Sequence, residues 1–587
     1  MATKAKTLKK SSSKKKKASR STSRAGKRKR SGAARTAAGR KSTQDVPPAP
    51  AADDAVDHNS PATLHSPGNG TVSIRMYRGL LGDFFLVRHA AAGRVFKMLI
   101  DCGVLQRIGT AEAKPSTSLG KARIVDNVAD FMKETGEEVD LVVATHEHYD
   151  HLSGFILASE KFKNFKIGKV WMAWTEDRTD KIANGYRNRT KKALAALAGL
   201  ALNSALAPDS DAMQTVNNLL QFYGEKADIR AHTLGLAKPE ADGKLPGNAS
   251  CEAVLDWLRT RAGAANVSFL KPGEVVRWGI DDAFRAYVLG PPRDDKLLRQ
   301  LNPSKEDSEV YLTQREELFL ARSGEVEMVA GLAAIHGAAS DGRDAGAEID
   351  DQPFTRMYQH PYPAGKTRAG DRRGLVKLEP RSPKDPIAML YRSKQVFDRC
   401  IDDEWLGSAE SLALKIDNDV NNTSLALALE LADKRVLLFP GDAQVGNWLS
   451  WDRQSYPADD RPGGPALKID DILARVIFYK VGHHASHNAT MRERGLELMT
   501  NSSLVAMIPV VELTAREQKT RTSPKGWAMP YDKLYERLDK RTGGRIIRGD
   551  GDTTTEQSKF KGSIFNLSYG ADFKDKDPLW AELRLDV

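Results

Sequence analysis

We predict an α+β fold, because the sequence combines short apolar runs of strand length with longer segments of helical spacing. The clearest strand covers residues 139–144, a β-branched apolar run whose length suits a strand buried on both faces. Residues 123–135 have the apolar spacing of an amphipathic helix, and residues 178–222 are rich in Ala and Leu with similar spacing. The chain is also long enough to bury a sizeable core.

The first 68 residues differ in composition from the rest of the 587-residue chain. Residues 1–41 contain 17 Lys and Arg and no Asp or Glu, whereas the remainder contains 72 basic and 77 acidic residues. The net charge of +12 therefore comes from this basic tail. Because residues 1–68 have almost no large apolar side chains, we predict that they are disordered and that residues 69–587 form the folded domain.

The basic tail, residues 1–41, is expected to bind nucleic acid without sequence preference. Each Lys or Arg placed on a phosphate releases condensed counterions, which favours binding to any polyanion. The tail has no aromatic side chain that could stack on a base. The alternative is a tail that only keeps the protein in solution.

Cysteine use and hydropathy favour a cytoplasmic protein. The three cysteines, Cys102, Cys251 and Cys400, are far apart and odd in number, which argues against a disulfide framework. No apolar run approaches the roughly 20 residues that span a bilayer, and no apolar secretory segment is visible at the N-terminus. We therefore expect a cytoplasmic protein without a membrane partner, associated with the nucleoid if the tail binds DNA.

Four side chains that can bind a metal ion directly follow the strand at 139–144, namely His146, His148, Asp150 and His151. In an extended chain His146 and His148 point to the same side, because side chains alternate with a period of two. A helix that begins near residue 149 would turn Asp150 and His151 toward the same point. Zinc, manganese and iron all accept this set of nitrogen and oxygen donors. Surface histidines at a strand end are the weaker alternative.

Two later apolar runs also end on polar side chains. The run RVLLFPGD delivers Asp442, and a carboxylate that bridges two metal ions must arrive at a strand end of this kind. A plain turn aspartate is the alternative. The run RVIFYKVGHHASH reaches His483 and His484, of which we assign His484 as the ligand. His483 is then free to hold a substrate phosphate or to donate a proton, and His487 is expected outside the ligand set.

The spacing H-x-H-x-D-H after an apolar strand resembles the signature of metallo-β-lactamase-fold hydrolases. The blocks NNTSLALALE, LLFPGDA, YKVGHHAS and MPYDKLYERLDKRTGGRIIRGDGD resemble one branch, the soluble hydrolase domain of bacterial competence DNA-uptake channel proteins and its free-standing relatives. The resemblance covers about residues 72–552, with a helical insertion at about 178–265 and an irregular or helical one at about 294–408. It implies a four-layer αββα sandwich with a metal centre at one edge.

We expect this centre to hold two divalent ions, zinc or manganese, that share an attacking water. One ion would have the ligands His146, His148 and Asp442, and the other Asp150, His151, His484 and the same Asp442. Asp101 and Asn422 are expected to orient the ligands from behind. We assign catalytic roles to Asp150 and His483.

The chain departs from that branch in two respects. The membrane channel is absent, so DNA import by this chain is not implied. Ala485 replaces a glycine in the HHAS block. As is typical of this branch, no clear histidine of the superfamily's third motif is present, since His232 is the only histidine between His151 and His336 and is a weak candidate. The first metal site is therefore expected to be weakly held or open to water.

Three functions are compatible with these patterns. The first is a metal-dependent phosphodiesterase or nuclease, with the tail attracting nucleic acid to the centre. The second is a metallo-hydrolase of a small phosphoester, nucleotide or acyl ester, with the tail serving only localisation. The third is a catalytically inactive nucleic-acid-associated binding protein. We favour the first, although the acidic body does not suggest a continuous nucleic-acid groove.

Overall fold

The computed structural model describes residues 70–105, 108–110, 113–202, 244–247, 249–300, 419–458, 465–518, 525–572 and 577–587. All of them belong to one unit, His65–Val587. The predicted disordered segment, the basic tail, His232 and most of the second insertion lie outside the described residues. In the described part of the chain, no helix is long and apolar enough to cross a membrane.

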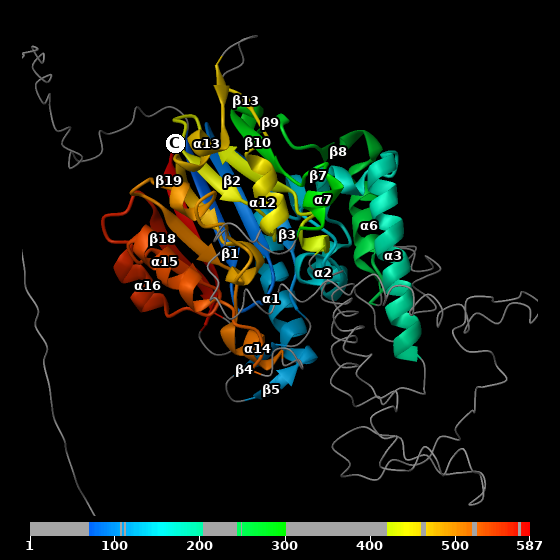
Figure 1. Cartoon of the computed structure of the whole chain (residues 1–587). Coiled ribbons are helices and arrows are strands. Elements are labelled where there is room, and N and C mark those ends of the chain that lie inside the picture. The colour runs from blue at the N-terminus through cyan, green and yellow to red at the C-terminus, as the bar shows by residue number, and fades with distance from the viewer. Residues whose placement is uncertain are drawn as a thin grey trace, which may run out of the picture. The chain divides into compact units, whose positions relative to one another are not determined.

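The first sheet has eight strands in the order β18-β19-β1-β2-β3-β6-β7-β8 (Figure 1). Strands β18, β19, β1, β2 and β3 pair antiparallel, whereas β3, β6, β7 and β8 pair parallel. Their bounds are Thr71–Tyr77 (β1), Phe84–Ala91 (β2), Arg94–Cys102 (β3), Glu138–Ala144 (β6), Lys166–Ala173 (β7), Val267–Leu270 (β8), Asn566–Asp572 (β18) and Pro578–Asp586 (β19).

The second sheet has seven strands in the order β17-β16-β15-β12-β11-β10-β9. Strands β9 to β12 form an antiparallel meander, and β12, β15, β16 and β17 pair parallel. Their bounds are Val275–Trp278 (β9), Phe284–Gly290 (β10), Ala426–Glu430 (β11), Val436–Phe439 (β12), Val476–Lys480 (β15), Val505–Ile508 (β16) and Ile546–Arg548 (β17). Two further hairpins pair β4 (Ile108–Thr110) with β5 (Ala113–Ser116) and β13 (Tyr456–Pro457) with β14 (Ala466–Leu467).

The two sheets share one hydrophobic core. Because strand side chains alternate between faces, Leu141 and Val143 of β6 enter this shared core with Leu427 and Leu437 of the second sheet. Val142, between them, packs on the other face against helices. The apolar residues 141–144 of β6 therefore form the part of the strand that is buried on both faces, as predicted, whereas Asp140 is exposed.

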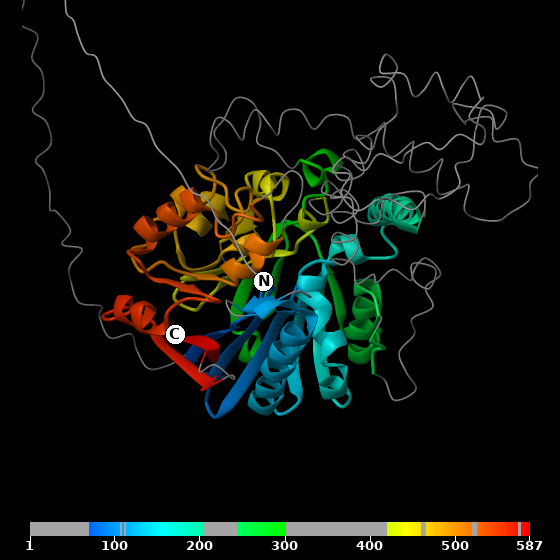
Figure 2. The same cartoon turned by 90° about the horizontal axis from the view of Figure 1, so that it is seen from below.

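Helices cover the outer face of each sheet, as Figure 2 shows by the blue-to-green helices on one side and the yellow-to-orange helices on the other. On the first sheet these are α1 (Thr117–Thr135), α2 (Tyr149–Leu157) and α6 (Cys251–Ala262). On the second they are α12 (Val445–Trp451), α13 (Ile469–Leu473), α14 (Glu512–Glu517) and α15 (Asp532–Thr542). The remaining described α-helices are α3 (Lys181–Leu202), α7 (Asp295–Leu298) and α16 (Thr553–Lys559).

The described part is thus a mixed α/β structure of two packed sheets between helices. The helix expected at 123–135 begins earlier, at Thr117. Within the segment expected as a helical insertion, α6 contributes Val254 and Leu258 to the core under the first sheet. Helix α6 is therefore part of the helix layer.

The carboxyl ends of the parallel strands meet at one edge of the two sheets. Thr145 follows β6 in the first sheet, and Leu425 precedes β11 in the second. The backbone N–H of Leu425 donates to the carbonyl of Thr145 at 2.9 Å, which joins the sheets at this edge. The loops after β6, β12 and β15 leave from the carboxyl ends of such strands, the usual place for ligand sites in open α/β sheets.

Candidate metal centre

Four predicted ligands from three loops converge in the structure: Asp150, His151, Asp442 and His484. One ligand atom of each lies within 4.8 Å of the others, and all four residues are buried. His484 Nε2 lies 3.0 Å from Asp150 Oδ2, and His151 Nε2 lies 3.1 Å from Asp442 Oδ2. We call these residues the four-residue group. Nearly 300 residues separate the loop after β6 from that after β12, and folding brings them together.

The four-residue group has the donor chemistry of a metal site. Asp150 Oδ1, His151 Nε2 and Asp442 Oδ2 are buried and lack a hydrogen-bond partner. Buried polar atoms are normally paired, so atoms that approach closely without hydrogen-bond geometry are best explained as facing a common ion. Nitrogen and oxygen donors without thiolate suit zinc or manganese. The buried His and Asp side chains could therefore hold a metal ion.

The two histidines of this group are fixed in the tautomer that a metal ion requires. His151 Nδ1 lies 2.8 Å from Asp101 Oδ2, and His484 Nδ1 lies 2.7 Å from the carbonyl oxygen of Pro509. A carboxylate and a carbonyl can only accept, so each Nδ1 carries the proton. The other nitrogen of each ring, Nε2, faces a carboxylate, Asp442 Oδ2 for His151 and Asp150 Oδ2 for His484, so an ion that displaces the proton there would gain the Nε2 lone pair.

Asp101 anchors the whole loop that carries the first motif. Besides His151, its carboxylate accepts from the backbone N–H of Thr145 at 2.8 Å and from the Thr145 hydroxyl at 2.6 Å. It lies at the end of β3, next to β6 in the same sheet. The structure therefore places Asp101 behind a ligand, where it orients the ring.

His146 and His148 lie beside the four-residue group and contact each other. His146 Nε2 is 3.1 Å from His148 Nδ1, and His146 Nδ1 is 3.0 Å from Thr145 Oγ1 and 3.2 Å from Ser424 Oγ. Burial lowers the pKa of His148 to about 4, against the opposing effect of Asp150. Burial, with the neighbouring histidines, also holds the pKa of His146 well below its ordinary value. Both rings are thus neutral at pH 7, the form that binds metal.

Two further side chains adjoin this pair. The ring of His151 lies 4.2 Å from that of His146, measured between ring centroids. Asn421 is a buried polar neighbour of His148 that raises the pKa of that ring against the effect of burial. An ion at the histidine pair would therefore have an amide nearby.

Opposing charges surround the four-residue group. Burial alone would lower the pKa of His151, but Asp442, Asp83 and Asp150 outweigh it and raise the pKa well above the ordinary value. Burial alone would raise the pKa of Asp150, yet His151 and His484 lower it to about 2. A divalent ion would replace the proton on His151 in balancing these carboxylates.

The loop after β15 gives its two histidines different surroundings. His483, His484 and Ala485 have φ of 45°, 52° and 63°, so three successive residues adopt the left-handed conformation that glycine favours. His484 is buried in the four-residue group, whereas His483 is partly exposed. His483 Nδ1 lies 2.8 Å from Ser486 Oγ, whose hydroxyl donates to Asn488 Oδ1 at 2.9 Å. Ser486 therefore accepts from His483, which leaves the Nε2 of that ring as an acceptor.

The other predicted residues are placed as follows. Asn422 Oδ1 accepts from the backbone N–H groups of Gln444 and Asn447, at 3.1 and 3.2 Å, so its amide holds the loop after Asp442 and contacts no ligand side chain. The ring of His487 faces Tyr531, with ring centroids 6.2 Å apart. His232 lies outside the described residues.

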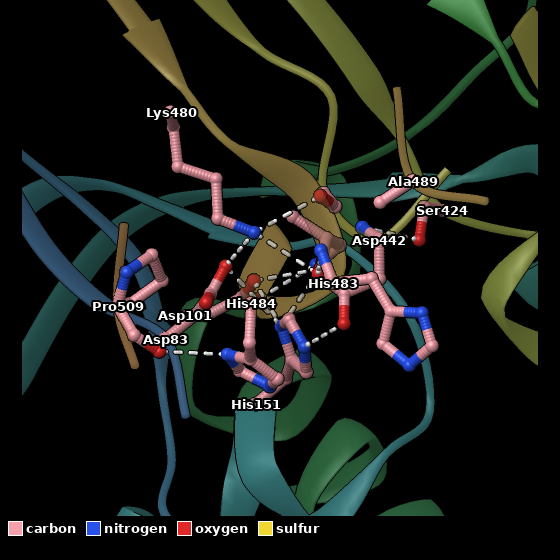
Figure 3. A network of polar contacts seen from close by, with 12 residues as sticks. Asp83, Asp101, His151, Ser424, Asp442, Lys480, His483, His484, Ala489 and Pro509 are labelled. Carbon is pink, nitrogen blue, oxygen red and sulfur yellow. Dashed lines mark hydrogen bonds and ion pairs between the residues drawn. The ribbon is translucent and has the colours of Figure 1, made fainter. Parts of the chain in front are cut away.

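The sequence reasoning missed several polar residues of the centre, among them Thr145 and Asn421. Ser424 contacts both His146 and the backbone N–H of Asp442, and Asp83 and Lys480 form an ion pair beside Asp442 (Figure 3). Lys480 carried a usable signal, because a lone charge at the end of the apolar run RVIFYK needs a buried partner. Ser424 and Asp83 carried none, since serine and aspartate are common before strands.

Comparison with known proteins adds no assignment. No protein-family model matches the chain, and no curated protein is detectably similar to it. The functional argument therefore depends on the geometry of the centre and on the sequence motifs.

Proposed function

We propose that the chain is a metal-dependent hydrolase of the metallo-β-lactamase fold that cleaves phosphodiester bonds in nucleic acid. The observation that carries this proposal is the four-residue group, in which Asp150, His151, Asp442 and His484 converge from three loops. The two packed sheets with helices outside are compatible with that fold. Its expected ligand motifs lie at the carboxyl ends of the parallel strands.

Two divalent ions are proposed, with the four-residue group as the stronger site. Asp442 would be shared, and His146 and His148 would hold the second ion with fewer ligands. Zinc and manganese both suit these donors. When bound, the ions would activate a water at neutral pH and stabilise negative charge on the phosphate oxygens.

The protein's own residues would position the substrate and handle protons. Asp101 holds His151, and Pro509 holds His484, so the ligands need little rearrangement when an ion binds. Asp150 serves as a ligand beside the reacting water. Burial lowers the pKa of His483 to about 4, so this partly exposed ring is neutral at pH 7 and presents Nε2 as a hydrogen-bond or proton acceptor.

Nucleic acid is the favoured substrate because of the basic tail. Its 17 Lys and Arg without an acidic residue would bring polyanions to the domain. The net-acidic composition of the remaining chain favours a second candidate, hydrolysis of a small phosphoester, nucleotide or acyl ester. In that case the tail would only localise the enzyme.

A nuclease assay distinguishes these functions. The purified full-length chain should cut plasmid DNA or linear single strands in the presence of Mn²⁺, and EDTA should stop the reaction. The double variant His146→Ala/Asp150→Ala should lose the activity, whereas His487→Ala, which lies outside the group, should keep it. Cutting by the double variant at the original rate would contradict the proposal. Activity on a small phosphodiester but not on DNA or RNA would favour the second candidate.

A further inference from the structure

Lys480 places a buried ammonium group inside the candidate metal centre (Figure 3). It ends β15, and only 1% of its side chain is exposed. Its Nζ lies 3.0 Å from the carbonyl oxygen of Gly441, 3.0 Å from Asp442 Oδ1 and within contact of Asp83 Oδ2. An ammonium has three N–H donors, so these three acceptors satisfy it completely.

The surrounding carboxylates keep this lysine charged. Its Nζ contacts two carboxylates and a carbonyl oxygen, which can only accept, so the group is an ammonium with three N–H donors. A permanent positive charge therefore lies against two carboxylates that would otherwise face a metal ion. Asp83, Asp101 and His151 have ligand atoms within 4.8 Å of one another, so these acids could form a further cation site. The ammonium of Lys480, in contact with Asp83, already balances the negative charge of these acids.

The lysine also divides the two oxygens of Asp442 between different contacts. Oδ1 accepts from Lys480 and, at 2.8 Å, from the backbone N–H of His483. Oδ2 has no hydrogen-bond partner and lies 3.1 Å from His151 Nε2. Asp442 therefore presents a single oxygen to the four-residue group.

We propose that Lys480 is a positioning residue that takes the place of a cation between Asp83 and Asp442. It restricts Asp442 to binding ions through Oδ2, and its charge limits the affinity of the centre for divalent ions. This inference rests on the metal centre of the proposed function and adds a residue that sets its affinity.

Charge and packing predict opposite results when the lysine is removed. A positive charge a few ångströms from a divalent ion repels it, so the loss of that charge should tighten ion binding. If Lys480 only supports the fold around Asp442, its loss would misplace a ligand and weaken binding. The sign of the change in affinity therefore separates the two roles.

The test is a Mn²⁺ titration of the full-length chain, with free Mn²⁺ measured by electron paramagnetic resonance. Lys480→Met should bind Mn²⁺ more tightly than the unchanged chain, by about tenfold or more. Lys533→Met, which removes the same charge from an exposed position of α15, should leave the affinity unchanged because solvent screens it. Equal or weaker binding by Lys480→Met would overturn the proposal.

In Lys480→Met, Asp83 and Asp442 face each other without a counter-charge. If this repulsion prevents folding, a second pair of variants replaces the first. Asp83→Asn removes one of these charges, and the double variant Asp83→Asn/Lys480→Met should bind Mn²⁺ more tightly than Asp83→Asn alone. Equal or weaker Mn²⁺ binding by the double variant than by Asp83→Asn would also overturn the proposal. If the unchanged chain binds no Mn²⁺ or Zn²⁺ at all, the proposed function fails as well, so the two failures are distinguishable.

Discussion

The two parts of the candidate centre differ in how their ligands are held. In the four-residue group, His151 Nδ1 donates a hydrogen bond to Asp101 Oδ2, and His484 Nδ1 donates one to the carbonyl oxygen of Pro509. Both of these oxygens can only accept. His146 and His148 instead contact each other and the hydroxyls of Thr145 and Ser424. Preorganised rings lose less freedom on binding an ion, so the four-residue group should fill first and hold its ion more tightly.

The shared carboxylate should give the largest effect. Asp442→Asn keeps the shape of the side chain but removes the charge that serves both parts of the centre. Hydrolytic activity should fall by roughly 1,000-fold or more, because several kcal/mol of transition-state stabilisation depend on the ions. Steady-state assays at saturating Mn²⁺ measure this loss. A loss below about tenfold would mean that Asp442 does not serve both parts.

Two substitutions of histidine by alanine compare the two parts of the centre directly. His484→Ala should abolish tight binding and leave less than one ion per chain, because it removes a ligand of the four-residue group. His148→Ala removes the same type of ring from the other part and should retain one tightly bound ion. Elemental analysis after gel filtration gives both values. Equal losses in the two variants would contradict the proposed order of filling.

Substitution of Asp101, which accepts a hydrogen bond from His151 Nδ1, should have a smaller effect on ion binding. Asp101→Asn removes the charge that holds the Nδ1 proton, and the affinity for the ion should fall by about 10–100-fold, as is typical when such partners are lost. Ser424→Ala is the comparison behind His146. It also removes the acceptor of the Asp442 backbone N–H but no contact with a ligand atom of the four-residue group, so its effect on the tightly bound ion should be smaller. Calorimetric titration of Zn²⁺ into each metal-free variant checks this. Affinity losses of similar size would remove the distinction between the two parts.

A substitution of Glu430, which lies far from the centre, should have the smallest effect on metal binding. Glu430, at the opposite end of β11 from Ser424, accepts from Tyr287 at 2.7 Å and from Arg475 at 2.6 Å. Burial alone would raise the pKa of Glu430, but the hydrogen bonds from Arg475, Tyr287 and Lys434 lower it below 4.5. The stabilisation by ionised Glu430 is therefore present above pH 4.5 and is lost as pH falls through the folded pKa.

Glu430→Gln should accordingly destabilise the fold by about 1–3 kcal/mol at pH 7. The difference from the unchanged chain should shrink as pH falls below 4.5 and through the folded pKa. Urea unfolding at several pH values measures it, while metal content at pH 7 should stay constant. A variant that unfolds normally but loses its ion would show that the centre depends on this distant strand end.

Local patterns predicted much of this molecule. The run at 139–144 gave a buried strand, because period and length are properties of a short segment. Asp442 and His484 were expected at the centre because each follows an apolar run and because the first motif and the family resemblance require further ligands. The strand did not need knowledge of neighbouring strands, whereas these ligands needed the whole pattern.

The remaining contacts depend on which segments become neighbours. Lys480 is paired by Asp83, nearly 400 residues earlier, and its role follows only once β15 lies beside β12. Asn422 was expected behind a ligand, but its amide holds the backbone after Asp442 and Ser424 contacts the ligands. These two polar residues, separated by Thr423, differ here in the direction that the turn gives them, which composition does not specify.

The claim that three distant loops form one divalent-ion site is tested most directly by a single metal-binding measurement. Metal-free full-length chain and its Asp442→Asn variant should be titrated with Zn²⁺ in the presence of a competing chelator of known affinity. The account predicts that the unchanged chain binds at least one ion tightly and that the variant loses this binding while it remains folded. Absence of binding by the unchanged chain, or equal binding by the variant, would contradict it.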